Sequence, residues 1–428
     1  MSDAKPKFRS VPEGVTEDTG LAADGSILAT NDGTLMLIQG GGVHESAGET
    51  PSRRFSEDGG QTWSDPVPLS STIGAGGVIR LHSGALAMYG TKGRARGACY
   101  CCTSRDDGHS WSAPVEIPAK LGFYPMYHSM IQLTSGRILL VGYWGIQIDP
   151  PDARRYTVSN SGLWRDRWLW MEGHRTPGIG MALVHYSDDE GKTWSPGGAG
   201  GALFGWFDEC GVPNGEGGVI GIYEPTAAQA DDGRVLLFAR SKTGRLVQSY
   251  SMDGGQTWYS ILPTELASSA APPMLVQIPK TRDLLCVWNQ VSAEEIRRGY
   301  HRGRLSAAIS TDSGLTWKNF RTIELMEGME DIARITPEVP VAREIRGRPG
   351  LGQLPDSYAM FTYSNVDIVG DQVFVRYSRQ WPVAREGKGP APDPNDMQVS
   401  NKLHEERGAE MRGERVIRRY PLAYFYEQ

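Results

Sequence analysis

One octapeptide pattern, Ser-x-Asp-x-Gly-x-Thr/Ser-Trp, recurs five times in this chain of 428 residues. The copies are Ser56–Trp63, Ser104–Trp111, Ser187–Trp194, Ser251–Trp258 and Ser310–Trp317. Asp and Gly supply the backbone angles and the side-chain-to-backbone hydrogen bonds of a tight turn, so we expect the Trp to pack beneath that turn. A unit that recurs with insertions indicates a repeat architecture.

Two apolar runs joined by a Gly-containing turn precede several of the boxes, as in Ile27–Ile38, Met130–Val141 and Thr226–Ala239. A third run then leads directly into the box, as in Leu246–Tyr250 and Leu305–Ile309. Four short antiparallel strands in a repeat of about 50 residues are typical of a propeller blade.

A sixth hairpin, Asn365–Tyr377, has no box, and Val416–Tyr426 is expected to be a last strand that closes the ring against N-terminal sequence. The sequence therefore predicts an all-β fold, a six-bladed β-propeller of four-stranded antiparallel blades with Asp-box hairpins. Seven blades is the alternative count. We expect a single domain over residues 1–428, because the repeats span the chain and 39% of its residues are hydrophobic.

Two segments interrupt the repeats. The insert Trp144–Gly178 contains Trp164, Trp168 and Trp170 beside Arg154, Arg155, Arg165 and Arg167. Long inserts on a rigid scaffold often shape binding sites, and the alternatives are a packed, helix-containing loop or a subunit contact. The second segment, Pro382–Arg415, is rich in Pro, Gly and charge and is predicted to be an exposed excursion.

The composition excludes several classes of protein. The net charge is −6 without a basic stripe, which argues against a nucleic-acid partner. No run approaches the ~18 apolar residues of a membrane span, and the chain starts without an apolar signal segment. Cytoplasm is the default expectation, with secretion as the alternative if further residues precede Met1.

The five cysteines, three of them crowded at Cys99, Cys101 and Cys102, do not form a disulfide framework and lack zinc-finger spacing. We expect them to be reduced thiols, most of them buried in strands. No His, Asp and Glu cluster has ligand spacing, so neither a metal nor a cofactor is expected.

Candidate functional residues stand where innermost strands begin, because these strand starts commonly face the ligand pocket of a propeller. Tyr127 and His128 hold this position in the third repeat, Glu224 in the fourth and Tyr363 in the sixth. A charged residue at such a place needs a partner, so Glu224 is the strongest candidate among them.

The five boxes resemble the Asp boxes of the sialidase (neuraminidase) superfamily. More specific is Glu224–Ser251, which resembles the family segment where a Glu opens a strand and an Arg follows one strand later, just before a box. On this resemblance Glu224 would polarise a catalytic tyrosine. Arg245, or Arg240, would bind a substrate carboxylate, since arginine can hold a carboxylate through two hydrogen bonds.

Two further positions match the family pattern. Arg304, or Arg302, precedes the fifth box where another arginine of the family's triad is expected. The segment 363–365, Tyr-Ser-Asn, resembles the family's nucleophile segment, so Tyr363 would be the nucleophile. Sialidases are glycosidases that use a tyrosine nucleophile.

The chain departs from the family near its start. Where the family has an Arg-Ile-Pro segment, this chain has Leu21–Ile27, with Asp24 and no arginine. The loop expected to carry the acid/base Asp, Gly40–Arg54, contains His44 and Glu45 but no Asp. This chain therefore resembles a divergent member, with His44 or Glu45 as the candidate acid/base and Asp24 as a candidate binding residue.

The resemblance implies an exo-acting glycoside hydrolase whose substrate is sialic acid or another acidic sugar. The second hypothesis is a polysaccharide lyase that cleaves uronate-containing glycans, with His128 and Tyr363 moving protons and Arg245 neutralising the uronate. The third is a non-catalytic propeller that binds glycans or proteins.

Overall fold

The computed structural model describes most of the chain. The described residues are 5–10, 17–18, 25–41, 49–92, 98–119, 122–126, 128–147, 160–172, 178–197, 202–203, 205–206, 219–220, 222–241, 244–292, 294–295, 298–300, 302–329, 352–386 and 408–427.

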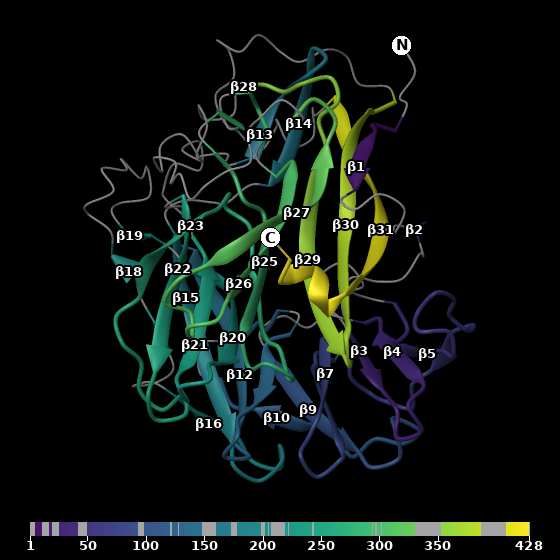
Figure 1. Cartoon of the computed structure of the whole chain (residues 1–428), viewed down its shortest axis with the longest axis vertical. Helices are drawn as coiled ribbons and strands as arrows, with labels where there is room; N and C mark the ends of the chain where they lie inside the picture. Colours follow the sequence, from purple (N-terminus) through teal and green to yellow (C-terminus); the bar gives the residue numbers. More distant parts are fainter. Residues whose placement is uncertain are drawn as a thin grey trace.

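Within these residues, six β-sheets of four or more strands follow one another along the chain (Figure 1). The first three sheets consist of β3 (Ser26–Ala29), β4 (Leu35–Gln39), β5 (Ser52–Ser56) and β6 (Val67–Pro68); β7 (Gly77–Arg80), β8 (Leu86–Gly90), β9 (Cys99–Ser104) and β10 (Val115–Ile117); and β11 (Met130–Gln132), β12 (Ile138–Gln147), β15 (Gly178–Ser187), β16 (Ser195–Pro196) and β17 (Ala202–Leu203). The fourth and fifth consist of β20 (Tyr223–Gln229), β21 (Val235–Arg240), β22 (Arg245–Ser251) and β23 (Leu262–Ala267); and β24 (Met274–Gln277), β25 (Leu284–Trp288), β26 (Arg304–Ser310), β27 (Lys318–Met326) and β1 (Phe8–Ser10).

The sixth sheet is built on β29 (Met360–Val369), β30 (Gln372–Ala384) and β31 (Ala409–Pro421), and a short ribbon joins β18 (Gly205–Trp206) to β19 (Val219–Ile220). The predicted sixth hairpin is confirmed, because β29 pairs with β30 from Met360 to Val369. The fold is therefore all-β. In each main sheet, strands that are consecutive in the chain pair antiparallel with one another.

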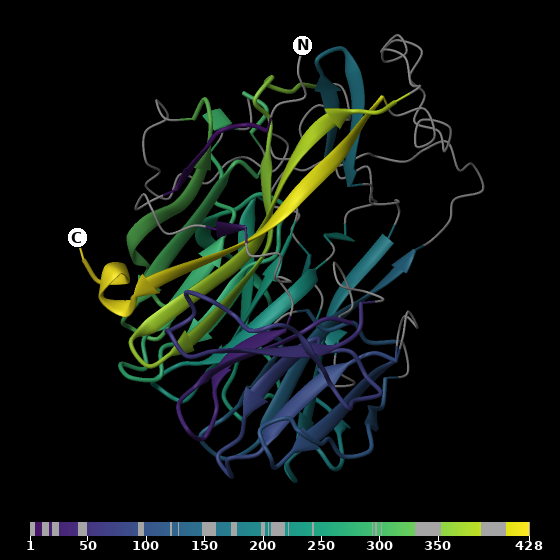
Figure 2. The ribbon, with the colours of Figure 1, turned by 90° about the vertical axis from the view of Figure 1, so that its right-hand side faces the viewer.

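The first strand of each sheet contacts the first strand of the next. These inner strands are β3, β7, β11, β20, β24 and β29, and β29 in turn contacts β3. Figure 2 shows the result, with the purple first sheet lying beside the yellow-green strands of the sixth. The inner strands thus follow one another in a ring, and apolar clusters fill the spaces between neighbouring sheets.

Glutamine side chains at the ends of inner strands tie neighbouring sheets together. The Gln132 Oε1 atom accepts a hydrogen bond from the N–H of His82 at 2.7 Å, and Gln229 Oε1 accepts one from Thr134 at 2.8 Å. The three residues Gln132, Gln229 and Gln277 share the same register against the following strand. Glutamines at equivalent positions of the repeat therefore connect neighbouring sheets at more than one boundary.

The five boxes form the predicted turns. In the first, Ser56 Oγ accepts from the N–H of Gly60 at 2.8 Å, and Asp58 accepts from the hydroxyl and the N–H of Thr62. The other four boxes repeat these bonds. Each turn follows the third strand of its sheet. The turn is stable there because the Asp side chain accepts hydrogen bonds from backbone N–H groups that have no partner in the strand pairing.

The N-terminal residues join the last two sheets. Strand β1 pairs with β27 in the fifth sheet, and β2 (Glu17–Asp18) pairs with β31 in the sixth. The expected contact between the last strand and N-terminal sequence is thus present. The boundaries of that strand differ from the expected Val416–Tyr426, because Pro421, which has no N–H for a ladder, ends β31, and a 3₁₀ turn follows over Leu422–Phe425.

Both interrupting segments contain strands. The insert holds the hairpin of β13 (Asn160–Trp164) and β14 (Arg167–Glu172), rather than a helix in its described part. This hairpin pairs with β28 (Gly352–Gln353) and with the start of β31, in the upper part of Figure 1. The second segment is only partly an excursion, because β30 and β31 extend their ladder to the pair of Ala384 and Ala409.

Four of the five cysteines lie in described strands, and all four are free and buried: Cys99, Cys101, Cys102 and Cys286. Burial raises the pKa of the Cys99 and Cys102 thiols to about 12, so both stay protonated. No helix among the described residues is long and apolar enough to cross a membrane.

Candidate functional site

Three of the predicted site residues have a backbone conformation that side-chain-bearing residues rarely adopt. The φ angles of His128, Glu224 and Tyr363 are 45°, 51° and 53°. The pairing of β20 shifts register between Tyr223 and Thr226, next to Glu224, and that of β29 shifts between Thr362 and Asn365. A bulge re-aims a side chain, and such strain concentrates at functional sites. Two inner strands therefore carry the same distortion at their candidate residues.

The two bulges bring Tyr363 and Glu224 together. The Tyr363 hydroxyl donates to Glu224 Oε1 at 3.4 Å, although the fourth and sixth sheets are separated by the fifth. The second carboxylate oxygen, Oε2, accepts from Nη1 of Arg240 at 2.9 Å. The side chains of Glu224 and Arg240 are 5% and 2% exposed, so each charge is neutralised by the other rather than by water.

Tyr143, on β12, is a neighbour of this pair that no sequence pattern indicated. Burial, and then the nearby Glu224 carboxylate and Tyr363 phenol, raise the pKa of Tyr143 well above its ordinary value. Its ring contacts those of Tyr124 and Tyr223 edge-on. Tyr143 therefore stays a protonated donor beside the Glu224–Tyr363 pair.

His128 lies in a second polar network. Its Nε2 atom is 2.7 Å from Oδ1 of Asp367, and Oδ2 of that carboxylate accepts from Arg376 at 2.8 Å. Burial raises the pKa of Asp367, but the charges of Arg376 and His128 together lower it by more than burial raises it. The pKa of Asp367 is therefore below its ordinary value. Arg376 also donates to the carbonyl of Gly25 at 2.9 Å. An ionised carboxylate thus orients the imidazole.

The remaining arginines differ in their surroundings. Nε of Arg304 pairs with Glu295 at 2.7 Å, and both side chains are buried, so this guanidinium is held by the fold. Arg302 donates to the carbonyl of Ala270 at 2.7 Å, between the beginnings of β24 and β29. Arg245 begins β22, where its carbonyl accepts from the Ser241 hydroxyl.

Four predicted residues fall outside the described residues: Asp24, His44, Glu45 and Tyr127. Asp367, Arg376 and Tyr143 lie in the site region, and sequence reasoning missed them. The alternation of Asn365 and Asp367 after Tyr363 is a signal that could have found Asp367, since both stand on one face of the strand.

A cavity of about 500 Å³ lies between the six inner strands. All six contribute to its wall, which is mostly aliphatic, and His128 and Asp367 line it together. Its other lining residues come from the later parts of the strands, such as Val369 and Gln277. Tyr363 and Glu224, which stand near the beginnings of β29 and β20, are not among its lining residues.

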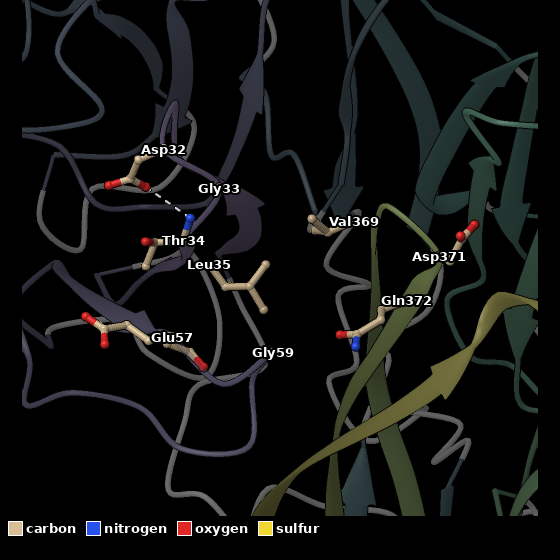
Figure 3. Close-up of a pocket in the computed structure, with 10 residues that line it drawn as sticks. Asp32, Gly33, Thr34, Leu35, Glu57, Gly59, Val369, Asp371 and Gln372 are labelled. Atoms are coloured by element: carbon tan, nitrogen blue, oxygen red, sulfur yellow. Dashed lines mark hydrogen bonds between the residues drawn. The ribbon is translucent and has the colours of Figure 1, made fainter.

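A second cavity, of about 620 Å³, lies between the first and sixth sheets (Figure 3). Asp32, Glu57 and Asp371 line it. Asp32 accepts from the N–H of Thr34 at 3.0 Å, and Asp371 pairs with Lys280 at 2.8 Å, so the fold uses two of its carboxylates. No group of three or more metal-ligating side chains occurs among the described residues.

Comparisons with known proteins agree with this description. The family model of the BNR repeat-like domain matches residues 81–375. No curated protein matches the chain. A solved protein of unknown function from Dyadobacter fermentans is 16% identical, covers 96% of this chain and 99% of its own, and gives a TM-score of 0.52.

Two enzymes have similar structures at low identity. The NanB sialidase from Streptococcus pneumoniae, as its K499G mutant, is 11% identical, with 98% of this chain and 69% of that chain covered and a TM-score of 0.52. The α-L-arabinofuranosidase Arb93A from Fusarium graminearum is 12% identical, with 99% and 98% covered and a TM-score of 0.50. These likenesses concern the fold, whereas the family match extends over more than half of the sequence. The chain belongs to the BNR repeat-like domain family, as its repeated boxes indicated.

Proposed function

We propose that this chain is a glycoside hydrolase of sialidase type, folded as a single six-bladed propeller. The contact chain from Tyr363 to Glu224 to Arg240 carries the proposal. A phenol is a weak nucleophile until a base takes its proton, and the Glu224 carboxylate is within reach of that proton. The ring of inner strands supports the count of six blades.

In the proposed reaction, the Tyr363 oxygen attacks the anomeric carbon while its proton passes to Glu224. The bond from that carbon to the leaving oxygen breaks, and an acid protonates the leaving group. His44 and Glu45 are the candidates for that acid. The residue that protonated the leaving group then takes a proton from water, whose oxygen attacks the anomeric carbon and breaks the glycosyl–tyrosine bond. Glu224 returns its proton to Tyr363, so two displacements leave the anomeric configuration retained.

An acidic sugar fits this scheme, because a carboxylate at the reacting carbon would repel an anionic nucleophile, whereas a phenol enters uncharged. By the family resemblance, Arg245 or Arg240 and Arg304 or Arg302 are the candidates to hold that carboxylate. Arg240 and Arg304 also pair with Glu224 and Glu295. Asp24 and Tyr127 are proposed to complete the binding site. An exo-acting enzyme on sialic acid or a related sugar is the proposed activity.

The test is release of the fluorescent aglycone from an aryl sialoside and from aryl glycosides of other acidic sugars. Tyr363→Phe and Glu224→Gln should each reduce kcat by at least about a thousandfold. Tyr250→Phe is the matched control and should keep full activity, because the ring of Tyr250 is stacked on that of Tyr259, away from the proposed site. Turnover retained by Tyr363→Phe would show that another residue is the nucleophile.

A polysaccharide lyase is the second candidate, favoured by the orientation of His128 by Asp367. In this reaction, His128 would take the proton next to the uronate carboxylate, which Arg245 would neutralise. Tyr363 would protonate the leaving oxygen as a carbon–carbon double bond forms. Rising ultraviolet absorbance on polyuronate chains, lost in His128→Gln, would support the lyase and contradict the hydrolase. A folded protein inactive in both assays would leave the glycan- or protein-binding propeller.

A further inference from the structure

A polar bridge between His128 and Asp367 crosses the ring of inner strands. In the order of the ring, β11 and β29 lie opposite each other, because two inner strands separate them on either side. His128 precedes β11 and Asp367 lies on β29, and the contact of 2.7 Å between Nε2 and Oδ1 joins them. Of the described residues that line the cavity of about 500 Å³, none of the third sheet precedes His128 and none of the sixth precedes Val366. The bridge therefore forms the end of that cavity on the side where the inner strands begin.

Asp367 occupies a position of the repeat that is otherwise aliphatic. Counted back from the turn that follows it, each inner strand has an equivalent third residue, and the other five are Ile27, Val78, Met130, Ala227 and Leu275. One position closer to the turn, half-buried β-branched residues of four sheets line the cavity: Ile79, Ile131, Val276 and Ile368. The aliphatic wall thus ends at one polar pair.

Backbone groups at the inner edges of the strands are bound by side chains of the ring itself. The N–H of Val78 donates to Ser26 Oγ at 2.9 Å, and Arg80 donates to the carbonyl of Ala29 at 2.7 Å. A ligand in the cavity would therefore find these backbone groups already paired. Its gain there would come from covering aliphatic surface.

The imidazole of His128 is the polar group that this end of the cavity presents. An ionised carboxylate only accepts hydrogen bonds, so the Nε2 atom of His128 carries the proton that lies between it and Asp367. In the neutral ring, Nδ1 is then an acceptor. The His128 side chain is 17% exposed, against 2% for Asp367, so a ligand would reach the imidazole rather than the carboxylate.

We propose that the cavity binds a primary aliphatic alcohol, with the hydroxyl on Nδ1 of His128 and the alkyl chain along the aliphatic wall. Mostly apolar pockets with few polar groups are typical sites for small molecules. A hydroxyl both donates and accepts, so it suits the imidazole in its neutral and its protonated form, whereas a carboxylate would be repelled by Asp367. From Asp367 to Gly370 the strand rises about 10 Å, which leaves room for a chain such as that of 1-octanol. The site is separate from Tyr363 and does not depend on the proposed function.

The experiment is isothermal titration of the full chain with 1-octanol and with its isomer 1-methoxyheptane, which has no hydroxyl. 1-Octanol should bind at one site with a Kd of about 100 µM or tighter. The isomer should bind about tenfold more weakly, because it cannot donate to Nδ1, and octanoate should bind no better than the isomer. In protein with ¹⁵N-labelled histidines, 1-octanol should shift the Nδ1 resonance that is missing from His128→Gln.

A pair of variants tests the place of binding. Ile131→Phe fills the cavity from its wall and should weaken the binding of 1-octanol at least about tenfold. Val67→Phe makes a similar change on the exposed strand β6 and should leave binding unchanged. Thermal unfolding shows whether each variant is folded, and the comparison of the two isomers on the unaltered chain needs no variant.

Three results would each overturn the proposal. They are full binding of 1-octanol by folded Ile131→Phe, equal binding of the two isomers, and no binding in either the titration or the ¹⁵N spectra up to the solubility of the alcohol.

Discussion

Glu224 and Tyr363 both have a left-handed backbone conformation, with φ angles of 51° and 53°, and the Tyr363 hydroxyl lies 3.4 Å from Glu224 Oε1. The two residues belong to the fourth and sixth sheets, so the contact joins sheets that are not consecutive in the chain. Each residue stands beside a shift in strand register. The contact therefore depends on both distortions. With only one of the two bulges, the side chains of Glu224 and Tyr363 would not meet.

Replacing Arg240 should destabilise the protein as well as its site. Arg240→Gln leaves the Glu224 carboxylate buried without its cation, which should lower the free energy of unfolding by about 3–5 kcal/mol. Urea unfolding followed by tryptophan fluorescence measures this loss. The control is Lys280→Gln, which removes the exposed pair with Asp371 and should cost at most about 1 kcal/mol. Equal costs for both variants would contradict the prediction.

Asp367 should matter more for stability than His128, although they are partners. Asp367→Asn removes the buried ion pair of Asp367 with Arg376, at a cost of about 3 kcal/mol or more. His128 is 17% exposed, against 2% for Asp367, so His128→Gln should cost only about 1–2 kcal/mol. Urea midpoints of the two variants decide the order. The reverse order would contradict the prediction.

The boxes should make stability fall in acid. Burial raises the pKa of Asp253, but hydrogen bonds from Thr257 and Ser251 outweigh it and lower the pKa from 3.8 to about 2. A pKa that is lower in the folded state means that the carboxylate stabilises the fold above about pH 4, and that this contribution is lost as the pH falls toward about 2.

Asp253→Asn should therefore lower the Tm at about pH 6, and the difference from the parent should shrink at about pH 2.5. Asp65→Asn, which alters an exposed residue outside the boxes, is the control and should show no such change with pH. A constant difference between Asp253→Asn and the parent at both pH values would refute the role of ionisation.

Two glycines in left-handed turns should respond differently to alanine. At Gly25, φ is +82° and an added Cβ would lie 1.9 Å from the carbonyl oxygen of Ile38. At Gly33, φ is +89° and nothing lies within 4 Å. Gly33→Ala should cost about 1 kcal/mol from its backbone angle, whereas Gly25→Ala also forces strands β3 and β4 apart and should cost at least about 3 kcal/mol. Thermal unfolding compares the two, and equal shifts would count against the steric argument.

The repeats and the strand starts were readable from the sequence because they depend on local chemistry. A box satisfies its own backbone donors, as the bonds of Asp58 to Thr62 show, and such short-range bonds repeat wherever the residues repeat. Glu224 and Tyr363 were found by their place in that repeat. Their pairing with each other came only from the resemblance.

Long-range partners could not be predicted in the same way. Asp367 meets His128 although they are 239 positions apart, and Glu295 meets Arg304 in a buried pair that no periodicity marks. Tyr143 lies within a continuous apolar run, where its hydroxyl carries no sequence signal. The strands of the insert were missed because their partners, β28 and β31, follow about 200 residues later and cannot be inferred from local propensity.

The pairing of β2 with β31 places Glu17 opposite Ile417, so two segments that are far apart in the chain share one ladder. During synthesis, the earlier sheets can form one by one, but Glu17 and Asp18 have no ladder until the strand around Val416 emerges. This pairing therefore forms late and closes a long loop, which costs chain entropy. The strands that follow β2 and precede β31 meet as well: β29 contacts β3, and the side chains of Asn365 and Arg376 donate to the Gly25 carbonyl.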